Sequence, residues 1–433
     1  MLTKCKRRLL SSFLFLKIIK NVILLIGVRM KRIIYFLLVC IFIALTILVL
    51  LLINKKNIDN SVYMEDLKNY TLEQIKEYCD NNKLVLNIET EYNDLIPKDK
   101  VISQSILKDT KIKENDILNI TISKGIDYNK HSVNELGNIP VMMYHQIKDM
   151  KNIDTNYTGG NVDYDGYTRT SEAFRNDLEF YYNSGYRMIR LYDYVNGNID
   201  VKLGYSPIVL TFDDGLNEVK VLGLDENDNL LIDPNCALGI LEEYKKKYPD
   251  FNVTATFFIN STLFYNEKYN KKIINYLIDN GYDIGNHTLS HPNFNKISTE
   301  ETQKEVGKMY QILDDIIPSK YVNIIALPYG NPSNTSDNFK YILNGKYNDI
   351  SYNTISTLRV AWEADYSPFS LKFDKTYIKR IRAYDNNGTN FDIEYNFKVL
   401  ENNRYISDGN TNTVVIKEKD INNAKTDLQV ITY

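Results

Sequence analysis

The sequence predicts an α/β barrel domain that follows a transmembrane helix and a small α+β domain. Three observations support this fold class. An uncharged apolar run occupies residues 33–53, and a compact helix-and-strand pattern occupies residues 61–125. From residue 138 onward, strand and helix patterns alternate. Seven or so strand–helix repeats in about 260 residues favour a distorted barrel over an open sheet.

Composition sets the broad class of the protein. The 433 residues are 44% hydrophobic, which is enough for a globular core and more than one domain. The net charge of −3 at pH 7 provides no basic field, so we expect no nucleic-acid partner.

The apolar run reads IIYFLLVCIFIALTILVLLLI and is long enough to cross a bilayer as a helix. Nine lysines and arginines precede it, and Lys55 and Lys56 follow it at once. The positive-inside rule therefore places residues 1–32 in the cytoplasm and the chain after residue 54 outside. No small-residue cleavage site follows, so we expect a single-pass signal anchor at residues 33–54 of the cell membrane. Met30, followed by KRIIYF, also resembles a natural start.

Residues 61–125 form the expected small domain. Thr71 is the expected N-cap of a helix, and Gln74 completes a capping box. Strand-like runs follow at LVLNIET, KVISQSI and ILNITISKG. The opening TLEQI, the stretch EYNDLIPKDKVISQS and the closing ITISKG resemble a PASTA domain, although Asp99 and Asn115 replace glycines usual in that family. The resemblance implies attachment to peptidoglycan or a spacer role. Residues 126–137 are interpreted as a polar linker.

The elements of the large domain, residues 138–433, are predicted from periodicity. The strand candidates are residues 139–145, 186–191, 206–212, 253–259, 282–286, 322–327 and 352–357. The main helix candidates are residues 171–185, 236–248, 270–281 and 298–317. The tail, residues 404–433, reverts to short β segments that we expect on the outside.

Four of these strand candidates end on, or lead into, residues capable of chemistry. The ends carry His145, then Asp213 and Asp214, then His287 and His291, and then Pro328, Tyr329 and Gly330. Singly, each has an ordinary structural explanation, since Asp-Asp-Gly is commonly a turn. In an α/β barrel, however, the C-terminal strand ends form the active-site face.

Together these residues favour a divalent-metal hydrolase. The spacing of HTLSH places both imidazoles on one side of a helical turn, a recurrent zinc arrangement. Two histidines and one carboxylate leave positions open for water and substrate, as in catalytic sites. The second carboxylate is then free to act as a base. Zinc is the expected metal, and cobalt, manganese and nickel also tolerate such ligands.

Three motifs are similar to those of the polysaccharide deacetylases, carbohydrate esterase family 4: TFDDG (211–215), HTLSH (287–291) and LPYG (327–330). IPVMMYH, GYRMI, ATFFI and GYDIGNHTLSHPNF extend the resemblance over nearly all of residues 138–400. It implies Asp213 as catalytic base and Asp214, His287 and His291 as metal ligands. It also implies Thr288 as a brace of the histidine loop. The Tyr329 backbone N–H would face the oxyanion, with Pro328 and Gly330 beside it in the substrate-binding loop.

Two departures from the family pattern change these expectations. Ala326 stands where the family usually has an arginine that tethers the base, so Asp213 needs another partner, either Arg380 or Arg382. No histidine follows His291, so the family's late general acid is missing. In the poly-N-acetylglucosamine deacetylases, whose strand order looks circularly permuted, an early MYH supplies the acid. His145 matches that pattern.

Trp362 forms either a sugar-stacking wall or part of the core. The sequence therefore predicts a metal-dependent, extracellular N-deacetylase of an N-acetylglucosamine polymer. The PASTA-like domain favours peptidoglycan, whereas the early MYH favours an exopolysaccharide of poly-N-acetylglucosamine. The alternative of another class is a catalytically silent carbohydrate-binding protein of the cell wall. The departures at Ala326 and after His291 support it, and the four intact metal and base residues oppose it.

Overall fold

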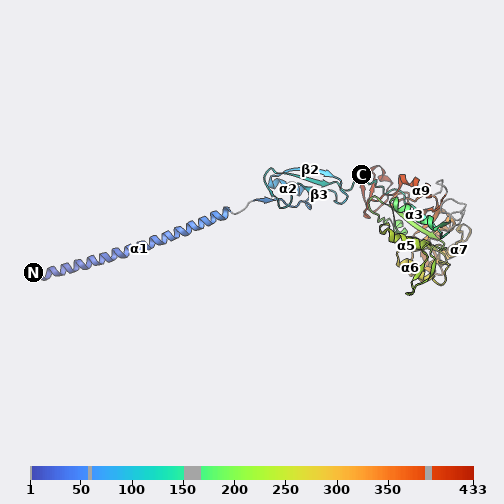
Figure 1. Ribbon diagram of the computed structural model, residues 1–433, viewed down its shortest axis with the longest axis horizontal. Coiled ribbons are helices and arrows are strands. Elements are labelled where there is room, and N and C mark those ends of the chain that lie inside the picture. The colour runs from blue at the N-terminus through green and yellow to red at the C-terminus, as the bar shows by residue number, and fades with distance from the viewer. Residues whose placement is uncertain (1, 57–60, 151–166, 386–392) are drawn as a thin grey trace. The chain divides into compact units, whose positions relative to one another are not determined.

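The computed structural model describes residues 2–56, 61–150, 167–385 and 393–433. The chain divides into two compact units, Met1–Ile126 and Asp127–Tyr433 (Figure 1). Each unit is described by itself below.

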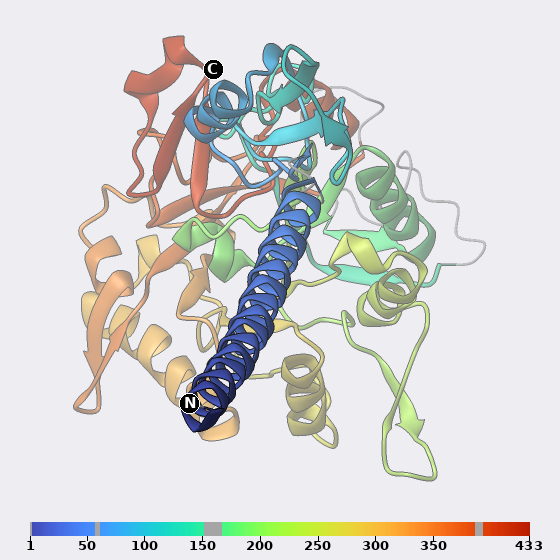
Figure 2. The same cartoon turned by 90° about the vertical axis from the view of Figure 1, so that its left-hand side faces the viewer.

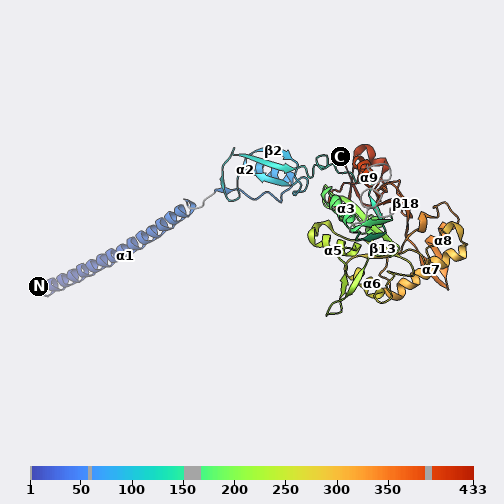
Figure 3. The same cartoon turned by 45° about the vertical axis from the view of Figure 1, so that its right-hand side comes forward.

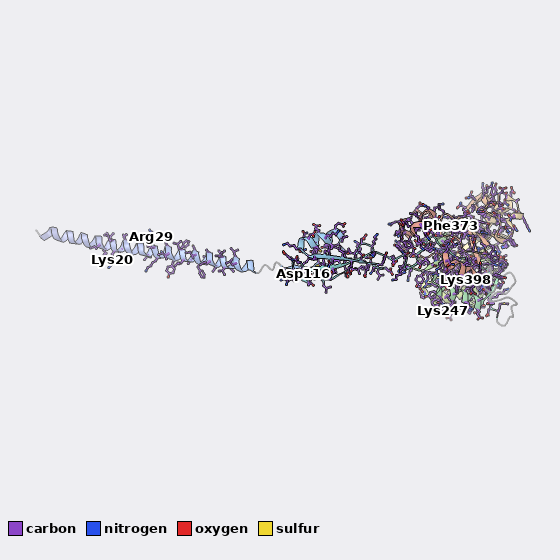
Figure 4. All side chains as sticks on the ribbon, turned by 90° about the horizontal axis from the view of Figure 1, so that it is seen from above. Lys20, Arg29, Asp116, Lys247, Phe373 and Lys398 are labelled. Atoms are coloured by element: carbon purple, nitrogen blue, oxygen red, sulfur yellow. The ribbon has the colours of Figure 1, made fainter. Side chains whose placement is uncertain are left out.

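The first unit begins with α1, a continuous helix over Leu2–Lys56. Within it, Leu16–Leu52 is long and apolar enough to span a membrane. Lys20 and Arg29 lie on this helix (Figure 4) and leave it unbroken, because both residue types favour the helical conformation. Residues 9–28, which precede the apolar run at 33–53, are therefore part of the same helix.

The PASTA-like part of the first unit packs one helix on a small sheet. Helix α2 (Leu72–Asn82) begins with the expected capping box, in which Thr71 accepts from the Gln74 backbone and the Gln74 side chain accepts from the Thr71 N–H. Strand β5 (Ile117–Ser123) lies between β2 (Val85–Glu91) and β3 (Val101–Gln104), and β1 (Val62–Tyr63) pairs with β4 (Lys111–Ile112). Asp99 and Asn115 adopt φ of 65° and 71°, which aspartate and asparagine tolerate in place of glycine.

The second unit is built around a closed barrel of seven parallel strands. In order around the barrel they are β6 (Val141–Tyr144), β10 (Ser206–Asp213), β13 (Thr256–Ile259), β14 (Asp283–Asn286), β15 (Ile324–Ala326), β18 (Ser356–Ala361) and β19 (Tyr377–Arg382). This spatial order follows the chain, and β19 closes the barrel by pairing with β6. All eight residues of β10 are buried, as expected for a strand covered on both faces.

Helices surround this barrel (Figure 3). They are α3 (Ser171–Asn183), α4 (Leu191–Asn196), α5 (Ala237–Lys247), α6 (Asn270–Asp279), α7 (Thr299–Ile316), α8 (Phe339–Leu343) and α9 (Ile393–Leu400). Short 3-10 turns lie at η1 (Pro249–Phe251), η2 (Phe294–Lys296), η3 (Pro328–Gly330), η4 (Glu401–Asn403) and η5 (Glu418–Asn423). The barrel core is aromatic and aliphatic, with Phe212 stacked between Tyr144 and Phe257.

The remaining strands lie outside the closed barrel. Strand β9 (Tyr186–Met188) pairs with β10, and β7 (Gln146–Lys148) pairs with β8 (Thr168–Thr170). Figure 2 shows two hairpins that project from the barrel, one in yellow-green and one in orange. They are β11 (Val221–Leu224) with β12 (Leu230–Ile232), and β16 (Asn344–Tyr347) with β17 (Ile350–Asn353).

The last two barrel strands differ from the sequence prediction. The strand expected at 352–357 straddles the end of β17 and the start of β18. Strand β19 is absent from the predicted set, because its YIKRIR sequence carries cations at buried positions. Such cations conceal the apolar signal on which strand prediction depends.

The residues that the sequence analysis interprets as a linker join the second unit. Asn134 and Asn138 form β-bridges to Ile406 and Arg404 of the C-terminal tail. Glu135 is buried there, and its carboxyl accepts from the Tyr405 hydroxyl and from backbone N–H groups of the tail. Burial, with Asp408 nearby, raises the pKa of Glu135 to about 8. In the tail itself, β20 (Thr413–Ile416) pairs with β21 (Gln429–Thr432).

Candidate active site

A pocket of about 540 Å³ opens among the C-terminal ends of the barrel strands. Six residues singled out from the sequence line it: His145, Asp213, Asp214, His287, His291 and Tyr329. Seven further residues complete the wall: Met143, Gln146, Tyr167, Thr168, Leu216, Leu327 and Val360. The parallel strands converge on one face, so residues more than 100 apart in sequence share this site.

Asp213 ends β10 and is held by Arg380 from β19. The two guanidinium nitrogens of Arg380 donate to the two carboxylate oxygens of Asp213, each at 2.7 Å. Both side chains are buried, 0% and 3% exposed. Burial alone would raise the pKa of Asp213, but Arg380 outweighs it and holds the pKa well below its usual range. Ala326 carries no charge, so Arg380 takes the place of the missing arginine.

Asp214, His287 and His291 form a separate cluster. One ligand atom from each lies within 4.8 Å of the others. The Asp214 Oδ1 atom is 3.2 Å from Nε2 of His287 and 3.5 Å from Nε2 of His291. One carboxylate and two imidazoles are a donor set suited to a divalent transition metal.

The environment of His287 tests whether this cluster fits a cation. Its Nδ1 lies 2.8 Å from the Ala326 carbonyl oxygen, which fixes the proton on Nδ1 and leaves Nε2 with a free lone pair. Nε2 is shielded from solvent and has no hydrogen-bond partner within the described residues. Nε2 of His287 and the Asp214 carboxylate are two acceptors that face each other with no hydrogen bond between them. A cation between them would bind to both, so these residues fit a divalent metal.

The histidine loop is held in a strained backbone conformation. Thr288 has a φ of 68°, which is rare for a β-branched residue. Its N–H donates to Asn286 at 2.7 Å, and its hydroxyl accepts from the His291 N–H at 3.0 Å. Asp214, His291 and Tyr329 also adopt positive φ values of 81°, 59° and 60°. Such strain persists only where surrounding contacts enforce it, and it concentrates at functional sites.

Glycines permit two close approaches beside the site. Gly215 has a φ of +75°, and a Cβ there would lie 2.0 Å from the Leu263 carbonyl oxygen. Gly330 has a φ of +65°, and a Cβ there would lie 2.9 Å from the Val360 backbone nitrogen. Both glycines therefore fix the turns that carry the neighbouring Asp214 and Tyr329.

Comparison with known proteins adds the family. A family model described as "Polysaccharide deacetylase" matches residues 200–344, and one described as "PASTA domain" matches residues 62–124. The chain carries a polysaccharide deacetylase domain. It also carries a PASTA domain, as the sequence predicts. The matched part of the deacetylase domain contains Asp213 and the cluster of Asp214, His287 and His291, whereas Arg380 and His145 lie outside it.

Proteins similar to this chain include one curated relative and two solved structures. The chain is 25% identical over 127 residues to a chitooligosaccharide deacetylase of Bradyrhizobium sp. (strain ANU 289), which is 29% of this chain and 48% of the relative. The chain therefore matches about half the length of that curated relative. A Streptococcus pyogenes deacetylase in complex with acetate has a TM-score of 0.42 at 17% identity, covering 58% of this chain and 94% of that one. A de-N-acetylase from Aggregatibacter actinomycetemcomitans has a TM-score of 0.37 at 12% identity, covering 56% and 94%.

His145 follows the first strand of the deacetylase domain and lines the pocket. The imidazole is half-buried, and its ring lies edge-on to Tyr167, 4.7 Å between centroids. Burial lowers the pKa of His145 to about 4, against the opposing effect of Asp213 and Asp214. Its imidazole is thus neutral at pH 7 and, once protonated, is a stronger acid than an ordinary imidazolium.

The substrate-binding residues expected from the sequence lie at and around the pocket mouth. Tyr329 is 63% exposed, with its ring 4.8 Å from that of His291. Pro328 and Gly330 flank it in η3 but do not line the pocket. Trp362 is half-buried rather than in the core, and it also lies outside the pocket lining.

Three pocket residues were not predicted from the sequence: Gln146 of β7, Thr168 of β8, and Tyr167, which precedes β8. No periodic pattern or motif marks these short strands. Their only signal is that they follow the strand that ends at His145.

Proposed function

We propose that the protein is a metal-dependent N-deacetylase of N-acetylglucosamine-containing polysaccharide outside the cell, with peptidoglycan as the favoured substrate. One observation carries this proposal: a buried, ionised carboxylate, Asp213, stands beside three clustered ligand groups without being one of them. A purely structural metal site has no need of this extra base.

Asp214, His287 and His291 would hold the cation, with zinc the expected metal and cobalt, manganese or nickel as alternatives. When bound, a divalent cation polarises the acetamide carbonyl and lowers the pKa of water at the site.

The chain's own residues would carry the proton transfers. Asp213, kept ionised by Arg380, accepts a proton from the attacking water. The Tyr329 N–H donates to the carbonyl oxygen as negative charge develops on it. His145 delivers a proton to the departing amine. Because its pKa is about 4, His145 is neutral at rest. It receives, through solvent, the proton that Asp213 has taken from water, and it passes this proton to the amine nitrogen as the C–N bond breaks.

The choice of polymer rests on the rest of the chain. The PASTA domain and the apolar helix α1 support a single-pass membrane protein whose deacetylase domain faces the cell wall. The placement of His145 directly after the first barrel strand supports the alternative, a poly-N-acetylglucosamine deacetylase. Acetate release from purified peptidoglycan and from poly-N-acetylglucosamine, with metal supplied, distinguishes them.

The decisive experiment compares wild type with Asp213→Asn, which removes the base while keeping the side-chain shape. We expect acetate release to fall at least about 100-fold while metal content stays unchanged. The silent carbohydrate-binding alternative predicts no acetate release from any polymer by the wild type, together with retained polymer binding. That result would overturn the enzymatic proposal.

A further inference from the structure

Arg382 lies on the same strand as Arg380 and on the same face. Side chains two residues apart in a strand point the same way, so Arg382 stands one layer nearer the pocket mouth than the arginine that holds Asp213. Its backbone pairs with Met143, which lines the pocket. The two arginines thus form successive layers of one wall.

Three aromatic rings surround the Arg382 guanidinium. Its central carbon lies 4.2 Å from the ring centroid of Trp362, 4.8 Å from that of Tyr384 and 5.1 Å from that of Tyr167. Tyr167 lines the pocket and contacts His145. The aromatic rings therefore hold a fixed cation beside the candidate general acid.

No anion of the described chain neutralises this cation. Arg382 forms no hydrogen bond or ion pair within the described residues, and its buried Nε–H has no acceptor. The carboxylates next in sequence to its aromatic neighbours are engaged elsewhere: Glu363, beside Trp362, pairs with Lys379 at 2.9 Å, and Asp385, beside Tyr384, pairs with Arg169 at 3.1 Å.

Three fully buried arginines of this unit have anionic partners: Arg169 pairs with Asp177, Arg187 with Asp250 and Arg380 with Asp213. The half-buried Arg382 has no such partner among the described residues. Its unpaired Nε–H is shared by Arg169 and Arg380, so the missing counter-charge is what distinguishes Arg382. An anion bound beside it would supply that counter-charge.

The geometry points to Arg382 as the recognition residue for an acidic substituent on the glycan, a carboxylate or phosphate on the deacetylated sugar or the one beside it. The inference rests on the proposed function. The planar guanidinium can donate two parallel hydrogen bonds to either a carboxylate or a phosphate. The three aromatic rings hold the guanidinium in place before the ligand binds. A neutral homopolymer of N-acetylglucosamine offers no partner, whereas a lactyl-bearing glycan does. The site therefore favours the acidic polymer of the two candidates.

The test measures acetate release by the full-length protein on three oligosaccharides of equal length. These are neutral chitopentaose, a muramic-acid-containing oligosaccharide with free lactyl carboxylates, and a 6-phosphorylated chitooligosaccharide. We expect wild-type kcat/KM to be roughly 10- to 100-fold higher on an acidic oligosaccharide, and Arg382→Gln to abolish that preference mainly through KM. Arg382→Lys keeps the charge but loses the fork and should be intermediate.

A matched control is Arg359→Gln. Arg359 is also half-buried and stacked on a tyrosine, Tyr377, at 5.4 Å. It precedes the pocket-lining Val360 on β18 and so faces the opposite way. We expect this variant to keep the wild-type preference.

Two results would overturn the inference: equal wild-type activity on neutral and acidic oligosaccharides, or an equal loss on all of them in Arg382→Gln. The better of the two acidic substrates identifies the anion. Calorimetric binding of the same oligosaccharides in EDTA separates this inference from the proposed function. If no acetate is released, preferential binding of the acidic oligosaccharide that disappears in Arg382→Gln still supports the site, and its absence refutes it.

Discussion

Replacing Arg380 with methionine removes one half of a fully buried ion pair while preserving most of the side-chain volume. Asp213 would lose two hydrogen bonds of 2.7 Å, and Thr211 would lose its 3.1 Å contact with the same guanidinium. Breaking a buried pair from one side costs about 3–5 kcal/mol, because a charge remains without compensation. We expect Arg380→Met to lower the free energy of unfolding of the deacetylase domain by this amount.

The assay is urea denaturation in EDTA, so that metal binding makes no contribution to stability. The double variant Arg380→Met/Asp213→Asn removes both charges and should recover about half of the loss in Arg380→Met. The coupling energy is this recovery plus the loss in Asp213→Asn alone, so it should be at least about 2 kcal/mol. Lys304→Met is the control, since the Lys304–Glu301 pair is roughly half exposed and should contribute under about 1 kcal/mol. A loss in Arg380→Met no larger than in Lys304→Met would refute the reasoning, as would a coupling energy near zero.

Three further predictions follow from the site and the C-terminal tail. Asp214→Ala and His291→Ala should each lose most bound metal in elemental analysis of the dialysed protein, and unchanged metal content would refute the ligand assignment. His145→Ala should lower kcat by about 100-fold at unchanged metal content, with little change in KM, and full activity would exclude it as the acid. The pKa of Glu135 is raised from 4.5 to about 8 in the fold, so its contribution to stability is present below pH 4.5 and is lost as pH rises to 8. Denaturation at pH 5 and pH 8.5 should therefore differ by up to about 4 kcal/mol. Glu135→Gln should flatten that dependence, and an equally steep profile in the variant would contradict the assignment to Glu135.

The cluster of Asp214, His287 and His291 was predictable from the sequence because its segments follow two barrel strands, β10 and β14. The shared direction of parallel strand ends brings these segments together. The helical turn expected for HTLSH was wrong: Thr288 and His291 have φ values of 68° and 59°, and residues 287–291 form a loop. The PASTA capping box at Thr71 was predictable because it depends on four consecutive residues.

The partner of Asp213 could not be chosen from the sequence. Arg380 and Arg382 are two residues apart and so point to the same face of one strand, which leaves side-chain alternation unable to separate them. Only the contacts in the folded chain decide: Arg380 donates to Asp213 and Thr211, whereas the Arg382 guanidinium lies against the rings of Trp362, Tyr384 and Tyr167. These contacts depend on the register of β19 with β6 and β18, a long-range property. The position of Trp362 beside Arg382 depends on the same register.

The closure of the barrel by β19 has a consequence for biosynthesis. The ribosome synthesises this strand last among the seven. More than half of the chain separates β6 from β19, so β6 lacks its second neighbour until late in synthesis. Until then β6 and β18 have unpaired edges, which invite pairing with other chains. Asp213 also stays without its counter-charge until the same moment. A nascent or truncated chain that ends before residue 377 would therefore be inactive and prone to aggregate. Pairing of β19 with β6 both closes the barrel and brings Arg380 to Asp213.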